Sequence, residues 1–77
     1  MRTINILNGP NLNLLGARQP EIYGNRTLAD LKQMCIEKGK ACSLNITFQQ
    51  SNSESVLVDW IQSAIGKSSG IIINAAA

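Results

Sequence analysis

The sequence contains no histidine, and this absence excludes several kinds of catalytic site within its 77 residues. Serine–histidine and cysteine–histidine pairs need an imidazole base, and protein metal sites commonly use histidine or several cysteines. The only cysteines are Cys35 and Cys42, which we place in one predicted helix, about 10 Å apart along its axis. That separation excludes a disulfide between them, and we expect both to be small buried side chains of a protein in a reducing compartment.

Charge and long apolar segments are also scarce. Charged residues make up 16% of the chain, and its net charge of +2 comes from scattered positions, which gives little support to nucleic-acid binding. No apolar run approaches the roughly 18 residues that a membrane span requires. Met1-Arg2 leads directly into a strand pattern, without the apolar region of a signal peptide. We therefore expect a cytoplasmic protein of one small domain that binds neither nucleic acid nor a membrane.

The spacing of the apolar residues predicts alternating strands and helices. A 3.6-residue period is typical of a helix with one buried face, whereas alternation or a short apolar run is typical of a strand. The predicted elements are a strand from Ile4 to Asn8, a helix from Leu28 to about Cys42, a strand from Leu44 to Gln49, a helix that opens with Ser51–Glu54 and ends near Gly66, and a strand from Gly70 to Asn74. This order predicts an α/β fold with a parallel sheet and right-handed crossovers.

Both helices carry a predicted capping box, Thr27 with Asp30 in the first and Ser51 with Glu54 in the second. Gly39 lies inside the first helix, where it costs about 1 kcal/mol relative to alanine and could end the helix early. We favour continuation because Cys42 keeps the apolar stripe in phase. The run Ile71–Ile73 suits a strand that is buried on both faces.

Amide side chains follow each predicted strand. They are Asn8 and Asn11 after the first strand, Gln49 and Gln50 after the second, and Asn74 after the third. Parallel strands bring their carboxyl ends to one edge, where ligands of open α/β sheets bind. Amides both donate and accept, so this edge suits a polyhydroxylated or carboxylated ligand, although the same residues also cap turns.

The segment between the first strand and the first helix is long for a connection, and it places Arg18 five residues before Tyr23. A tyrosine with a pKa near 10 is a poor base at neutral pH, and a nearby cation favours its phenolate. We therefore predict a lid, more mobile than the sheet, in which Arg18 activates Tyr23. A surface tyrosine beside a solvated arginine is the alternative interpretation.

Four segments carry a family resemblance: ILNGPNLNLLGARQPEIYGNRTL, QQSNSE, VDWIQSAI and GIIINA. In this order and spacing they resemble the type II 3-dehydroquinate dehydratases. The resemblance implies a flavodoxin-like three-layer α/β/α fold, with strand order 2-1-3 here and 2-1-3-4-5 in the whole domain. It also implies a cytoplasmic homododecamer of trimers that needs no metal or cofactor.

The resemblance further implies a lyase of the shikimate pathway, which converts 3-dehydroquinate to 3-dehydroshikimate by anti elimination through an enolate. By position, Tyr23 is the base and Arg18 holds it as phenolate. Asn11 binds the water that stabilises the enolate, and Asn74 binds substrate. The Gln50–Asn52 segment is expected to be structural or to support the residues that contact substrate, rather than to take part in the chemistry directly.

The family pattern continues beyond Asn74 with further residues, including a histidine that acts as the general acid, and the 77 residues contain none of it. We therefore interpret residues 1–77 as the N-terminal half of one dehydratase domain. The strand at Ile71–Ile73 should then be an edge. We expect the 77 residues by themselves to be inactive and associated.

Two other functions remain open from the sequence. A flavodoxin-like module could bind a mononucleotide, although NGPNLNLLG lacks the hydroxyls of a phosphate loop, and a flavin spectrum would decide. A noncatalytic half-domain for assembly is favoured by the missing histidine. A lysine Schiff base is not expected, because the lysines fall on helices or turns among polar neighbours.

Overall fold

The computed structural model describes residues 2–15 and 26–75. The chain forms strand β1 (Arg2–Asn8), a short 3-10 helix η1 (Leu12–Leu14), helix α2 (Leu28–Ala41), strand β2 (Leu44–Gln50), helix α3 (Glu54–Ala64) and strand β3 (Gly70–Asn74). The alternation of strands and helices predicted from the sequence is confirmed. The sequence did not predict η1.

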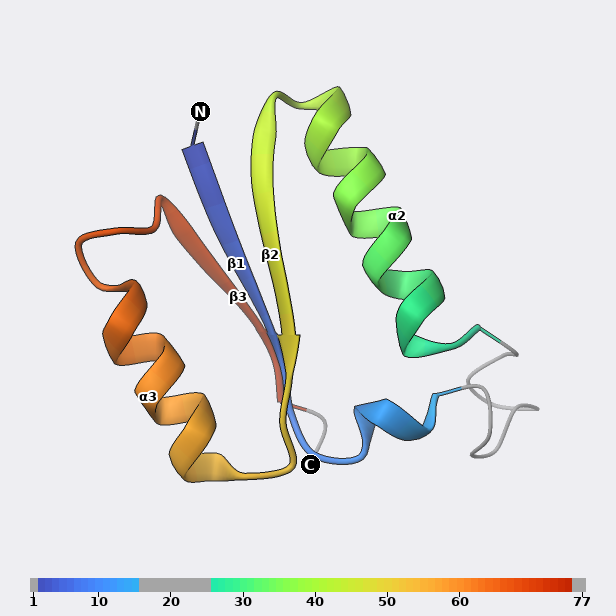
Figure 1. Cartoon of the computed structure of the whole chain (residues 1–77), viewed down its shortest axis with the longest axis vertical. Coiled ribbons are helices and arrows are strands. Elements are labelled where there is room, and N and C mark those ends of the chain that lie inside the picture. The colour runs from blue at the N-terminus through green and yellow to red at the C-terminus, as the bar shows by residue number, and fades with distance from the viewer. Residues whose placement is uncertain (1, 16–25, 76–77) are drawn as a thin grey trace.

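The three strands are parallel and lie in the order β2-β1-β3, as predicted. Helices α2 and α3 lie on opposite faces of this sheet, so the described chain has three layers (Figure 1). The side chain of Ile4 points to the face that α2 covers, because its register partner Ile46 lies against Gly39 of that helix. Ile6, two residues further along β1, shares that face. Thr3, Asn5 and Leu7 alternate with them and point to the α3 face.

Helix α2 begins with the predicted capping box. The backbone N–H of Asp30 donates to Thr27 Oγ1 over 3.2 Å, and the backbone N–H of Thr27 donates to Asp30 Oδ2 over 3.0 Å. The helix continues through Gly39, as predicted, but the reason lies in packing. Gly39 is buried, and a Cβ atom at this position would overlap the side chain of Ile46. The glycine therefore allows the helix to approach β2 closely.

Two sequence predictions about the helices are wrong. Cys42 is exposed rather than buried, because it is the C-cap residue where the chain turns away from α2, and only Cys35 lies partly covered. Helix α3 begins one residue after Ser53, so Glu54 is its first residue and cannot close a capping box with Ser51. Instead, Ser51 Oγ accepts a hydrogen bond of 3.0 Å from the backbone N–H of Ser53, which forms a local serine turn.

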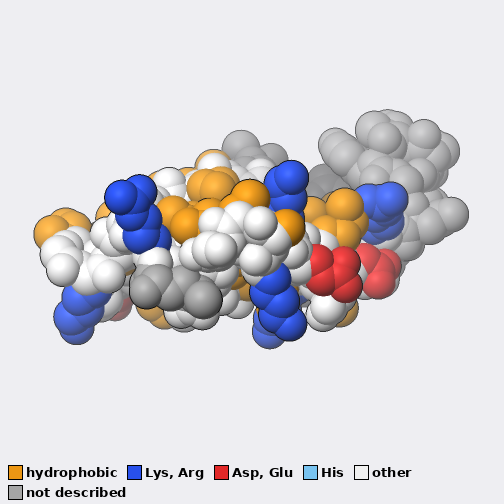
Figure 2. All heavy atoms as spheres, turned by 90° about the horizontal axis from the view of Figure 1, so that it is seen from above, with side chains coloured by type: hydrophobic (Ala, Val, Ile, Leu, Met, Phe, Trp, Pro, Cys, Tyr) orange, Lys and Arg blue, Asp and Glu red, His pale blue; other side chains and the backbone are white. Residues whose placement is uncertain are grey.

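Strand β3 is an edge of the described sheet, as predicted, but it is not buried on both faces. Ile71, Ile72 and Ile73 are 36%, 55% and 54% exposed. The centre of the sheet is better covered, since Leu7 of β1 is fully buried. In the view of Figure 2, hydrophobic side chains reach the surface between basic side chains that stand apart from one another. No helix in the described ranges is long and apolar enough to cross a membrane.

The exposed isoleucines predict self-association of the 77-residue chain expressed alone. An unpaired strand with apolar side chains on both faces is a template for pairing, and a lysine on the strand disfavours such pairing. Replacement of Ile72 by lysine should therefore shift the chain toward monomer in sedimentation velocity. Val58→Lys is the matched control, because Val58 is 49% exposed but lies on α3. Equal effects of both substitutions, or a monomeric parent chain, would contradict this prediction.

Candidate active site

The ends of the three strands lie in one row. Asn8 is the register partner of Gln50 on one side and of Asn74 on the other. Asn11 follows three residues after Asn8, at the same edge of the sheet. The predicted gathering of strand-end amides is therefore confirmed. Some of these amides form hydrogen bonds with the backbone, and others are exposed.

Asn8 serves the backbone. Its side chain is 1% exposed, and its Nδ2 donates a hydrogen bond of 3.0 Å to the carbonyl of Gln49. Its own carbonyl accepts from the backbone N–H of Ser51 over 3.0 Å. A buried polar side chain needs such partners, since leaving one unpaired costs about 1–3 kcal/mol. Asn8 thus fastens β1 to the end of β2.

Gly9 brings the chain against the end of β3. Its backbone N–H donates to the carbonyl of Asn74 over 2.9 Å. A Cβ atom at this position would lie 2.5 Å from the carbonyl oxygen of Ala75, closer than side-chain atoms approach backbone oxygens. Only glycine fits this contact without a shift of the backbone.

Asn11 lies in the left-handed region, with φ 68° and ψ −1°, at the start of η1. This conformation costs a residue other than glycine roughly 1–2 kcal/mol, and asparagine tolerates it better than most. The Asn11 side chain makes no capping bond to η1 and the residue is exposed. Its backbone N–H donates to Asn52 Oδ1 over 2.9 Å. The Asn11 residue is therefore exposed at the edge, while its backbone is held by the loop after β2.

Asn74 also lies at this edge and is exposed, with its carbonyl used by Gly9. Arg18 and Tyr23 lie outside the described residues, and so does the predicted lid between them. The pairing of Arg18 with Tyr23 stays a prediction. The structure thus brings together Asn11 and Asn74 among the predicted site residues.

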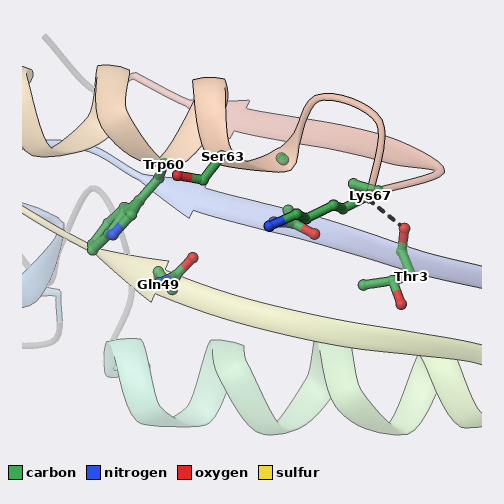
Figure 3. Close-up of a pocket in the computed structure, with 8 residues that line it drawn as sticks. Thr3, Gln49, Trp60, Ser63 and Lys67 are labelled. Carbon is green, nitrogen blue, oxygen red and sulfur yellow. Dashed lines mark hydrogen bonds between the residues drawn. The ribbon is translucent and has the colours of Figure 1, made fainter.

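The described residues also form a groove of about 220 Å³ on the α3 face of the sheet. Figure 3 shows Trp60 and Ser63 of α3, and Lys67 of the turn after it, on one side of the groove, facing Thr3 and Gln49 of the strands. Thr47, the register partner of Asn5 on this face, has a buried hydroxyl without a hydrogen-bond partner in the described part of the chain. The sequence analysis did not predict this groove, which shares only Gln49 with the strand-end amides.

The burial of Asn8 predicts a pH-dependent loss of stability in Asn8→Asp. The carboxylate would face the Gln49 carbonyl, and burial raises the folded-state pKa of a carboxyl above its unfolded value near 3.9. The variant then binds more protons when folded, so it loses stability as pH rises above about 4. Urea unfolding should show a larger loss relative to the parent at pH 7 than at pH 4. Asn45→Asp is the control, since Asn45 is exposed at the opposite end of β2; equal losses at both pH values for Asn8→Asp would refute the argument.

Comparison with known proteins agrees with this architecture. Residues 2–77 match the family model described as dehydroquinase class II. A 3-dehydroquinate dehydratase of Dinoroseobacter shibae is 60% identical over 74 residues, covering 96% of this chain and 49% of the relative. The same-named protein of Rhizobium meliloti is 55% identical over 75 residues, covering 97% and 51%.

Solved structures give the same result. The type II dehydroquinase of Butyrivibrio crossotus superposes with a TM-score of 0.94 at 40% identity, covering 99% of this chain and 53% of that one. That of Propionibacterium acnes gives 0.93 at 39% identity, covering 99% and 52%. The chain spans about half the length of the curated relatives that it matches. The match over residues 2–77, together with the shared parallel sheet, shows that the chain belongs to the class II dehydroquinase family.

Proposed function

We propose that this chain forms part of the active site of an enzyme that dehydrates 3-dehydroquinate to 3-dehydroshikimate. The observation that carries the proposal is the family match over residues 2–77, with a relative named 3-dehydroquinate dehydratase at 60% identity. The convergence of Asn11 and Asn74 at the carboxyl edge supports it. Exposed amides at this edge suit a small ligand rich in hydroxyl and carboxylate groups.

The reaction removes a proton beside a ketone and then expels a hydroxyl group from the neighbouring carbon. In our proposal the Tyr23 phenolate takes the proton from C2, and the electron pair of that bond forms an enolate. Asn11 holds a water that donates to the enolate oxygen, where charge develops. The enolate then collapses, and the hydroxyl leaves as water after protonation by a general acid, which the 77 residues do not supply as histidine.

Arg18 makes Tyr23 reactive in this scheme. A guanidinium about 4 Å from a phenolate gains ~4 kcal/mol at an effective dielectric of ~20, before desolvation. That attraction lowers the pKa of the phenol toward neutral pH. Asn74 would bind substrate from the end of β3, across the row of strand ends from Gln50.

The proposal extends to the setting of the enzyme. In this proposal the substrate is a small molecule and the enzyme is cytoplasmic. A homododecamer of trimers would cover surface that the described chain leaves exposed. The low net charge of +2 favours no nucleic-acid partner.

The proposed base can be tested in the full-length protein that carries this chain. Tyr23→Phe removes the proton acceptor and keeps the ring, so kcat should fall by the roughly 10²–10⁴-fold assigned to one acid–base group, with little change in substrate affinity. Arg18→Ala should lower activity and move the ascending limb of the kcat/KM profile to higher pH. The reason is that the pKa of the Tyr23 phenol rises when the nearby positive charge is removed. Arg18→Lys should restore part of the activity, since it keeps the charge without the planar fork.

The measurement is a pH–rate profile for the parent and the variants. A Tyr23→Phe enzyme that keeps more than about a tenth of the parental kcat would exclude Tyr23 as the base. An unshifted profile in Arg18→Ala would exclude Arg18 as its activator.

A further inference from the structure

Two side-chain amides join the loop after β1 to the loop after β2. Asn52 Oδ1 accepts from the backbone N–H of Asn11 over 2.9 Å and from Gln50 Nε2 over 3.1 Å. Gln50 Nε2 also donates to the carbonyl of Gly9 over 3.1 Å. Asn52 and Asn11 are 41 residues apart in sequence, so the contact exists only in the folded chain.

The orientation of both amides follows from the backbone groups at the two ends of this network. The N–H of Asn11 can only donate, so the facing atom of Asn52 must be its oxygen. The carbonyl of Gly9 can only accept, so the facing atom of Gln50 must be its nitrogen. The two hydrogens of that nitrogen then serve Gly9 and Asn52, and both lone pairs of Asn52 Oδ1 are used.

These bonds act on the strained part of the site. Asn11 is the residue with positive φ at the edge, and its side chain direction depends on that backbone conformation. The β3 side holds Gly9 through the backbone carbonyl of Asn74. The β2 side holds Gly9 and Asn11 through Gln50 and Asn52, and these are the contacts that a substitution can remove without breaking the sheet.

We propose that Asn52, oriented by Gln50, is a positioning residue that sets the conformation of Asn11 in the active site. This inference rests on the proposed function, in which Asn11 stabilises charge that appears during the reaction. Asn52 acts through Asn11 and touches no reacting atom in this scheme. Its loss should therefore reduce kcat more than it changes KM.

The test uses the full-length protein that carries this chain, with three variants. Asn52→Ala removes the acceptor and should lower kcat at least 10-fold, with KM changed less than 3-fold, as expected for loss of one stabilising contact in the transition state. Asn52→Asp keeps an oxygen for both donors and should recover most of the loss. Asn45→Ala is the matched control, since it removes an exposed amide at the other end of β2 and should leave kcat unchanged.

Crystal structures of the variants supply a readout that does not depend on activity. In Asn52→Ala, Asn11 should leave the left-handed region, whereas in Asn52→Asp it should keep it. If Asn52→Ala does not fold, Gln50→Glu replaces it, because its carboxylate would oppose the oxygens of Gly9 and Asn52 and should displace Asn11 in the same way.

The outcomes separate the two proposals. An active parent whose Asn52→Ala variant matches Asn45→Ala in kcat overturns the positioning role, and so does an Asn11 that keeps its conformation without Asn52. An Asn52→Asp variant as slow as Asn52→Ala also overturns it. A parent without dehydratase activity overturns the proposed function instead, and the conformation of Asn11 then decides the positioning role.

Discussion

The pairing of β1 with a parallel strand on each side is the constraint on which the rest of this structure depends. Within the described residues β1 is the strand with two neighbours, and its residue Leu7 is fully buried. Because all three strands run in one direction, the segments that follow them emerge at one edge. The candidate site exists because Gly9–Asn11 leaves β1 between the ends of β2 and β3.

Two close approaches adapt this general architecture to one particular site. Gly39 lets α2 lie directly against Ile46 of β2, and Gly9 lets the chain after β1 pass beside the carbonyl of Ala75. Each glycine is required by a neighbouring atom rather than by a turn. Gly39 allows helix α2 to pack closely on the sheet. Gly9 determines the path of the chain that leads to Asn11.

The amides at the strand ends divide into two groups with different tasks. The first group stabilises the edge, because its side chains form hydrogen bonds with backbone groups or with one another. It consists of Asn8, Gln50 and Asn52. Asn11 and Asn74 are exposed, and their backbone groups carry the structural bonds. A hydrogen-bonded group that holds a second, exposed group is the arrangement that accurate positioning of a substrate requires.

The sequence by itself determined the order of the elements, the parallel sheet and the common edge of Asn8, Asn11, Gln50 and Asn74. These follow from local periodicity, from the Thr27 capping box and from the preferred hand of β-α-β connections, all of which act over short stretches of chain. The resemblance of its segments also indicated the family, which the match over residues 2–77 shows.

Tertiary structure decided the rest, because it depends on which distant atoms become neighbours. The composition of β3 is typical of a buried strand, yet its isoleucines are exposed in the described chain, because burial depends on which other elements pack against them. The position of Cys42 fits the apolar stripe of the helix, but helix α2 ends one residue earlier and Cys42 is exposed. Asparagine at position 52 could have capped a helix, formed a turn or faced solvent, since its amide suits all three. Only the meeting of two loops 41 residues apart gave it the backbone of Asn11 as a partner.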